Sequence, residues 1–379
     1  MLASVMTASW NWLYAGREIF PAMFEAIENA RVSVQLEIYI YSPGALGNQF
    51  LEALRRAQQR GAEVHVLVDA LGSINLPATF WDPLRAVGGH VRQFNPISLN
   101  RLSIRNHRKL LVCDEQIAFV GGFNIAQEYD GDGITSGWCD LGMKLQGPMV
   151  GELAASFDEM FARADFQHKR FMRLRRFTAN KTVLAADEQF LFSGPGRGRN
   201  PIKQALQRDL AQAQNVQIIV AYFLPTWRLR RALTRVCSRA GRVQFILAGK
   251  SDVLISQLAG QSLYRRFLKA GVELYEYQPQ ILHAKLIIID DVVYVGSANL
   301  DQRSLNINYE LMIRLQKPEI AEQARAVFAN TLRHCRGITF EEWRKSGTLW
   351  RRIKQKWAYF LLVRIDPYIA KRQWKRLRD

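Results

Sequence analysis

The feature that most constrains the fold is a repeated order of helices and strands, in two copies about 180 residues apart. Hydrophobic periodicity in the first copy predicts alternating helices and strands over 19–30, 32–41, 49–60, 63–69, 80–87 and from 90 onward. In the second copy, it predicts the same alternation over 202–214, 216–224, 228–240, 243–248, 256–270 and 272–277. Strands that alternate with helices predict an α/β fold with a largely parallel or mixed sheet in each half.

Each copy also carries the pattern His-x-Lys-x4-Asp at the start of an apolar, strand-like run, and a glycine-containing turn that ends in asparagine follows it. The residues are His107, Lys109, Asp114 and Asn124 in the first copy and His283, Lys285, Asp290 and Asn299 in the second. Alternation along a strand places His and Lys on one face, where the core meets solvent. Two incidental histidines would not repeat together with their neighbours. The other four lack such partners and are interpreted as ordinary core or surface residues: His65, His90, His168 and His334.

These residue types suit the transfer of a phosphodiester. A neutral imidazole is a competent nucleophile toward phosphorus, and a second one can protonate the leaving alcohol and then deprotonate the incoming one. Two lysines and two asparagines can hold the phosphate oxygens as charge develops on them. Since these cations are side chains, the reaction requires neither a metal nor a cofactor. The pattern predicts double displacement through a phosphohistidine.

The paired motifs with their trailing GGFN and GSAN resemble the phospholipase D superfamily. Within it, the chain is similar to bacterial cardiolipin synthases over residues 14–335, above all in the segment NLDQRSLNINYE at 299–310. Further matching segments are LEIYIYSPG (36–44), GWCDLGMKLQGPMV (137–150), SGP (193–195) and AYFLP (221–225). The resemblance implies a duplicated phospholipase D-type α/β/α sandwich, bilobal, with one active site between the halves. It implies phosphatidyl transfer from phosphatidylglycerol to the alcohol of a second phospholipid head group.

The resemblance also implies roles for individual residues. His107 would be the nucleophile and His283 the general acid and base, although the sequence leaves open which of them is phosphorylated. Asp140 and Glu310 match the carboxylates that hydrogen-bond the two histidines. The phosphate would be held by Lys109, Lys285, Asn124 and Asn299, with Gly122 and Ser297 in the supporting turns.

The aspartates that end the two catalytic motifs, Asp114 and Asp290, would be structural partners rather than proton carriers. The two copies differ in the turn that follows. Six residues separate Asp114 from Gly121, but five separate Asp290 from Gly296, so the second turn is one residue tighter.

Charge is distributed unevenly along the chain. Lys and Arg number 52 against 34 Asp and Glu, which gives +18 and predicts an anionic partner. Residues 163–181 carry +6 and residues 341–379 carry +8. The predicted organisation is therefore a first half, a basic aromatic linker, a second half and a basic Trp-rich amphipathic tail, at residues 1–162, 163–181, 182–338 and 339–379.

The two basic segments are predicted to bind an anionic phospholipid membrane. Trp343, Trp350 and Trp357 stand seven apart, on one face of a helix surrounded by basic residues, which suits a bilayer interface. The alternative is that this Trp stripe packs on the body of the protein, and nucleic acid is a less favoured partner. The predicted membrane-binding residues are Phe171, Arg175 and Arg176 in the linker and Trp350, Arg351, Lys354 and Trp357 in the tail.

The resemblance implies a bacterial inner membrane, and other features of the sequence favour a peripheral enzyme on its cytoplasmic face. The start of the chain has no signal-peptide pattern, and no apolar run approaches the ~20 residues of a transmembrane helix. The four scattered cysteines indicate reduced thiols rather than a disulfide framework or a zinc site.

Three rival functions stay open: hydrolysis by a phospholipase D, cleavage of nucleic acid or another phosphodiester, and a non-catalytic lipid-binding scaffold. The acceptor, phosphatidylethanolamine or another alcohol among the alternatives, and the oligomeric state also stay open.

Overall fold

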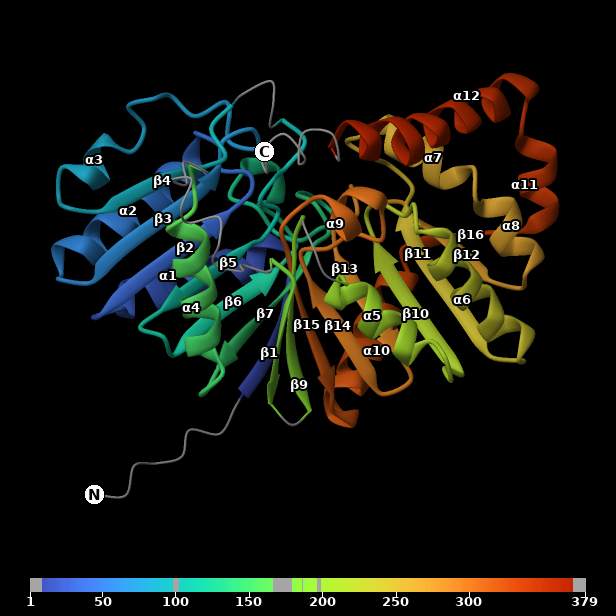
Figure 1. Ribbon diagram of the computed structural model, residues 1–379, viewed down its shortest axis with the longest axis horizontal. Helices are drawn as coiled ribbons and strands as arrows, with labels where there is room; N and C mark the ends of the chain where they lie inside the picture. Colours follow the sequence, from blue (N-terminus) through green and yellow to red (C-terminus); the bar gives the residue numbers. More distant parts are fainter. Residues whose placement is uncertain (1–8, 98–101, 166–178, 186, 196–198, 371–379) are drawn as a thin grey trace.

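A computed structural model describes residues 9–97, 102–165, 179–185, 187–195 and 199–370 (Figure 1). Two sheets lie side by side. The first has the order β1-β7-β6-β5-β2-β3-β4, with strands β1 Ser9–Tyr14, β2 Ser33–Ile38, β3 Glu63–Asp69, β4 His90–Phe94, β5 Leu110–Cys113, β6 Ile117–Gly121 and β7 Leu141–Gln146. The second has the order β16-β12-β11-β10-β13-β14-β15-β9-β8, with strands β8 Lys181–Ala185, β9 Glu188–Ser193, β10 Asn215–Val220, β11 Arg242–Ala248, β12 Glu273–Tyr277, β13 Lys285–Ile289, β14 Val292–Gly296, β15 Glu310–Gln316 and β16 Cys335–Ile338.

The two sheets share one topology. The order β7-β6-β5-β2-β3-β4 in the first is repeated as β15-β14-β13-β10-β11-β12 in the second. In each, the last three strands are parallel and the others pair antiparallel. The predicted duplicated α/β fold is therefore confirmed, and of the two sheet types expected, largely parallel or mixed, both sheets are mixed.

Helices cover both sheets, and β14 of the second sheet packs directly against β6 and β7 of the first. Those of the first half are α1 Ala15–Asn29, α2 Ala45–Gln59, α3 Asp82–Arg85, the 3-10 turn η1 Gln127–Tyr129 and α4 Val150–Phe161. Those of the second are α5 Pro201–Asp209, α6 Trp227–Ser238, α7 Leu254–Gln261, α8 Tyr264–Lys269, α9 Gln302–Asn306 and α10 Pro318–Leu332, followed by α11 Phe340–Ser346, α12 Leu349–Phe360 and the π-helical turn η3 Leu361–Ile365.

Alternation along the strands divides the apolar side chains between separate cores. Along β13, Leu286 and Ile288 enter a core that also contains residues of β5, α4 and α10, so this core is shared by both halves. Ile287 and Ile289 point the other way, into a core with α5, α6 and α8. A third core lies between the first sheet and helices α1 and α2. The shared core fixes the two halves against each other.

Two helices predicted as continuous are interrupted. The segment 256–270 forms α7 and α8, because the chain turns at Ser262 and Leu263 between them. In the tail, α11 ends at Ser346 and α12 begins at Leu349, where the Thr348 side chain accepts a hydrogen bond from the Arg351 N–H and caps the new helix. Trp343 therefore lies on a different helix from the other two tryptophans, and the prediction that all three share one helical face is wrong.

Candidate active site

The two motif histidines meet at the boundary between the halves. His107 comes just before β5, and its N–H donates to the carbonyl of Tyr309 in the other half at 2.9 Å. His283 comes just before β13, and its N–H donates to the carbonyl of Cys139 at 2.7 Å. Main-chain hydrogen bonds across the boundary thus fix the backbone position of both histidines.

Each imidazole is oriented by a carboxylate from the opposite half. Nδ1 of His107 lies 3.1 Å from Oε2 of Glu310, and Nδ1 of His283 lies 2.7 Å from Oδ2 of Asp140. Both carboxylates follow directly after the residues that bind the histidine main chain. Since a carboxylate holds Nδ1 in both rings, Nε2 is the nitrogen placed to react. Nε2 of His283 lies 3.1 Å from Lys285 Nζ and 3.4 Å from the Tyr129 hydroxyl.

The turns before the motif asparagines are matched to these carboxylates. Ser297 Oγ donates to Oε2 of Glu310 at 2.5 Å. At the equivalent position, a Cβ on Gly122 would lie 2.3 Å from Oδ1 of Asp140. The glycine therefore leaves room for the shorter, closer aspartate, whereas the serine supports the longer glutamate.

The two motif lysines are buried beside the histidines. Lys109 Nζ donates to the main-chain oxygen of His107 at 2.8 Å. Lys285 Nζ bonds to the main-chain oxygen of His283 and lies 2.8 Å from Nδ1 of its ring. Burial lowers the pKa of Lys109 to about 7 and that of Lys285 to about 8. An incoming phosphate would favour the charged ammonium form of both lysines.

The motif asparagines hold the segments that follow β2 and β10. Asn124 Oδ1 accepts the N–H of Ile40 at 3.0 Å, and its amide donates to the Tyr129 hydroxyl at 2.6 Å. Asn299 Oδ1 accepts the N–H of Tyr222 at 3.3 Å. These bonds explain why β2 and β10 end earlier than predicted: the chain leaves each sheet to line the site.

Asp114 and Asp290 lie at the other end of their strands, away from the histidines. The Asp114 carboxylate accepts the N–H groups of residues 31–33, and that of Asp290 accepts those of Gln214 and Asn215. Each therefore ties its hairpin to the start of the neighbouring central strand. The missing residue of the second copy falls in the β13–β14 turn, and both aspartates keep the same contacts.

Both histidines and both asparagines line a cavity of about 310 Å³. Sequence reasoning did not single out several other lining residues: Tyr39, Tyr129, Trp138, Tyr222, Asp252, Asp301, Arg303, Leu362 and Asp366. Tyr39 and Tyr222 follow the two equivalent strands, so the repeat itself contained a signal for them. Leu362 and Asp366 belong to the tail, which folds back over the cavity, where Asp366 pairs with Arg303 at 2.6 Å. Local sequence gave no sign of that contact.

The sequence matches the family described as "Cardiolipin synthase, PLD-like domain" over residues 23–163 and 206–332. The chain belongs to this cardiolipin synthase family. It is 33% identical over 347 residues to the major cardiolipin synthase ClsA of Bacillus subtilis (strain 168), and the matched region covers 90% of this chain and 72% of that protein. It is 32% identical over 302 residues to cardiolipin synthase B of Salmonella typhi, which covers 78% and 73%.

Solved structures share the fold of this family member. The phosphatidylserine synthase of Haemophilus influenzae Rd KW20 superposes with a TM-score of 0.73 at 16% identity, covering 95% of this chain and 94% of that one. The polyphosphate kinase of Porphyromonas gingivalis gives a TM-score of 0.58 at 14% identity, covering 96% and 53%. These similarities show the duplicated bilobal architecture.

The two carboxylates of the family member's site differ in protonation. Burial raises the pKa of Glu310 to about 8. Burial alone would also raise the pKa of Asp140, but His283 and Lys285 hold it below its ordinary value. Burial and the neighbouring lysines lower the pKa of both histidines, that of His283 to about 4. At neutral pH, Asp140 is charged, Glu310 is largely protonated and both imidazoles are neutral.

The tail presents two different faces. Ala358 and Gln355 are buried against the body, and Trp343 packs on Tyr264 with ring centroids 4.7 Å apart. On the outer face of α12, Trp350 is 74% and Trp357 is 62% exposed. Lys354 is also exposed, whereas the Arg351 guanidinium turns inward over the Trp343 ring. The predicted membrane-binding residues Phe171, Arg175 and Arg176 lie outside the described residues.

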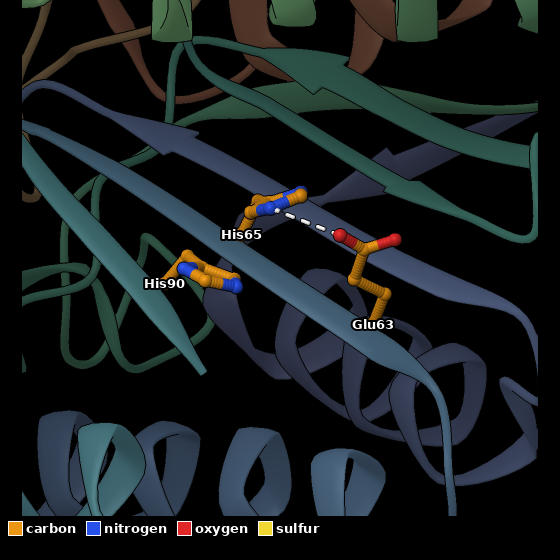
Figure 2. A group of neighbouring side chains, drawn as sticks. All are labelled: Glu63, His65 and His90. Carbon is orange, nitrogen blue, oxygen red and sulfur yellow. Dashed lines mark ion pairs between the residues drawn. The ribbon is translucent and has the colours of Figure 1, made fainter. Parts of the chain in front are cut away.

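One cluster among the described residues has the composition of a metal site (Figure 2). Glu63, His65 and His90 lie on β3 and β4, with His65 Nε2 at 3.4 Å from Glu63 Oε1. Glu63 and His65 lie near the start of β3. Asp69 lies at the end of that strand, where its carboxylate accepts a hydrogen bond from the N–H of Asn106, next to His107. The cluster and the segment that carries His107 therefore lie at opposite ends of β3, and none of the three cluster residues lines the catalytic cavity.

No helix among the described residues combines the length and the apolar character that crossing a bilayer requires.

Proposed function

We propose the route by which this cardiolipin synthase works: phosphatidyl transfer from phosphatidylglycerol to a hydroxyl of a second phospholipid head group, through a phosphohistidine. The observation that carries the proposal is the pair of histidines at the boundary between the halves. Each has Nδ1 held by a carboxylate from the opposite half and a buried lysine beside it. The family membership supports the same chemistry.

In the first step, Nε2 of His107 attacks the phosphorus of the donor. The bond between phosphorus and the oxygen of the head-group glycerol breaks, and the phosphatidyl group stays on His107. Nε2 of His283 gives its proton to the leaving glycerol. In the second step, the acceptor hydroxyl loses its proton to His283 and attacks phosphorus, which breaks the P–N bond and frees His107. When the acceptor is another phosphatidylglycerol, the products are cardiolipin and one glycerol.

The different protonation of the carboxylates supports this assignment of roles. A charged Asp140 stabilises an imidazolium, so His283 is suited to carry the proton that the leaving group needs. A neutral Glu310 gives no such stabilisation, so His107 stays an unprotonated nucleophile. Burial and then the charge of Lys285 lower the pKa of His283. A donor phosphate paired with Lys109 and Lys285 would offset the charge repulsion and favour the protonated form of this residue.

The outer face of the tail supports docking on an anionic membrane. Trp350 and Trp357 would enter the interface, and Lys354 would lie near anionic head groups, where a basic residue contributes about 1 kcal/mol. The turn that follows α12 also lines the catalytic cavity. Lipid would therefore reach the histidines from the docked surface, with the enzyme peripheral on the cytoplasmic face of a bacterial inner membrane.

Mass spectrometry of lipids tests the reaction. The purified protein is incubated with phosphatidylglycerol vesicles, with and without phosphatidylethanolamine, beside His107→Ala, His283→Ala and the control His90→Ala. Cardiolipin from the wild type and the control, but not from the other two variants, is the expected result. Phosphatidic acid alone would instead mean a hydrolase. Absence of any lipid product would contradict the lipid reaction and favour nucleic acid as substrate.

A further inference from the structure

A second cavity, of about 900 Å³, lies next to the catalytic one. Gln302 lines both cavities. The tail also borders both, since Tyr359, Val363 and Arg364 line the second cavity whereas Leu362 lines the first. The two cavities therefore adjoin at Gln302, and the tail borders both of them.

The second cavity is strongly basic. Its lining includes five cations and no acid: Arg199, Lys203, Arg228, Arg230 and Arg364. Among the residues that the structure describes, none of these five forms an ion pair with a carboxylate. Five positive charges gathered without compensation around one cavity attract an anion.

The inner cations are held in place by neutral groups. The Arg230 guanidinium lies 5.7 Å from the centre of the Tyr359 ring, and its buried Nε has no hydrogen-bond acceptor within the described part of the chain. Lys203 Nζ donates to the amide oxygen of Asn306 at 2.6 Å. Burial, and then the charge of Arg228, lower the pKa of Lys203. An anion would satisfy the buried Nε and relieve the repulsion between these cations.

We propose that this cavity binds the phosphate of the acceptor phospholipid, so that the hydroxyl of its head group reaches the histidines past Gln302. This inference rests on the proposed function and adds the place of the second substrate. The phosphate and the free hydroxyl of one glycerol head group are only a few bonds apart. This short separation suits two adjoining cavities that share the lining residue Gln302. The arginines supply forked donors and the lysine a point charge, which are the groups that recognise phosphate.

The site accounts for a choice between acceptors. A neutral alcohol can reach the phosphohistidine without using the basic cavity, whereas a second phosphatidylglycerol is held there by its phosphate. Removing the cations should therefore slow transfer to lipid far more than transfer to free glycerol.

Two reactions of the same protein separate these steps. Cardiolipin formation uses a lipid acceptor, and exchange of labelled glycerol into phosphatidylglycerol uses the same donor and histidines with a neutral acceptor. The double variant Lys203→Gln/Arg230→Gln is compared with Arg231→Gln, which removes a charge from the exposed side of the same helix, outside the cavity. We expect cardiolipin formation to fall at least tenfold in the double variant, glycerol exchange to change less than twofold, and the control to match the wild type.

Equal rates of cardiolipin formation in the double variant and the control would overturn the inference, and so would a parallel loss of both reactions. If the wild type itself carries out neither reaction, the proposed function fails, and this result is distinct from any difference between variants. Inorganic phosphate distinguishes a lipid phosphate from a free one. It should compete with phosphatidylglycerol or have no effect. A lower maximal rate at saturating lipid would make the cavity a regulatory site for free phosphate and contradict the proposal.

Discussion

At the scale of single residues, the two copies of the motif differ where their carboxylates differ. Gly122 faces Asp140, and Ser297 donates to Glu310. Gly122→Ser would force its Cβ against the Asp140 carboxylate and displace the group that orients His283. We expect kcat to fall at least 100-fold. Ser297→Gly, the reverse change, removes one hydrogen bond, for which about 1 kcal/mol and a loss of about fivefold are expected. Cardiolipin formation measured for both variants checks this order, and equal losses would contradict it.

The lysines predict the pH dependence. Their pKa values, about 7 for Lys109 and about 8 for Lys285, are lowered from 10.5, so the free enzyme loses both charges as the pH rises through these values. Because kcat/KM reports the free enzyme, it should begin to fall above about pH 7, where Lys109 loses its proton, and fall further above about pH 8, where Lys285 does. A profile that stays level to pH 10 would contradict the phosphate-holding role.

Stability should change in the opposite direction. A lysine whose pKa is lower in the folded state binds fewer protons there than in the unfolded state, so the free energy of unfolding rises with pH between the two values. These two lysines therefore stabilise the fold as the pH increases from about 7 to about 10.5. A melting temperature measured at each pH separates a loss of activity caused by deprotonation from one caused by unfolding.

At the scale of elements, α12 has one face on the body and one exposed. Trp350→Ala and Trp357→Ala should weaken binding to anionic vesicles about tenfold and leave the melting temperature unchanged, because both side chains are mostly exposed. Trp343→Ala is the matched control: it removes a ring packed on Tyr264, so it should lower the melting temperature and leave vesicle binding nearly intact. Vesicle sedimentation and thermal unfolding measure the two effects.

The central elements were predictable because their apolar periodicity and the repeat agreed. The 63–69 strand has the predicted bounds, and both motif histidines and both carboxylates come together as the resemblance implied. The break between α11 and α12 was missed because a seven-residue spacing of tryptophans continues across it. The Arg303–Asp366 pair joins residues 63 apart, and such a contact depends on tertiary packing rather than on local pattern. The basic cavity was missed for the same reason, because its lining residues come from segments far apart in the sequence, at 199–207, 226–230, 302 and 359–364.

At the scale of the whole molecule, both sheets contribute to one core. Unfolding should therefore give a single calorimetric transition. Phe157 on α4 is fully buried in that shared core, and Phe157→Ala should lower the free energy of unfolding by about 3–5 kcal/mol. The transition should move as a unit. The contrary result would be two separate transitions, with only the transition of the first half shifted by the substitution. That result would show that the halves unfold independently.

The separation of the Glu63 cluster from the cavity gives a prediction for chelation. The groups proposed to hold the phosphate are Lys109 and Lys285, and none of the three residues of the His–Glu cluster lines the catalytic cavity. EDTA should therefore leave the rate of cardiolipin formation unchanged, whether or not the cluster binds a cation. A loss of turnover that added Zn²⁺ or Mg²⁺ restores would contradict the route through side-chain cations.

The exchange of carboxylates between the halves has a consequence for how such a site can diversify. Two identical copies could assemble into the same arrangement, but each histidine would then have the same partner, and neither would be biased toward attack or toward proton transfer. Joining the copies in one chain frees each to change alone. Gly122 with Asp140 on one side and Ser297 with Glu310 on the other is a specialisation that a symmetric pair of half-length chains could not reach.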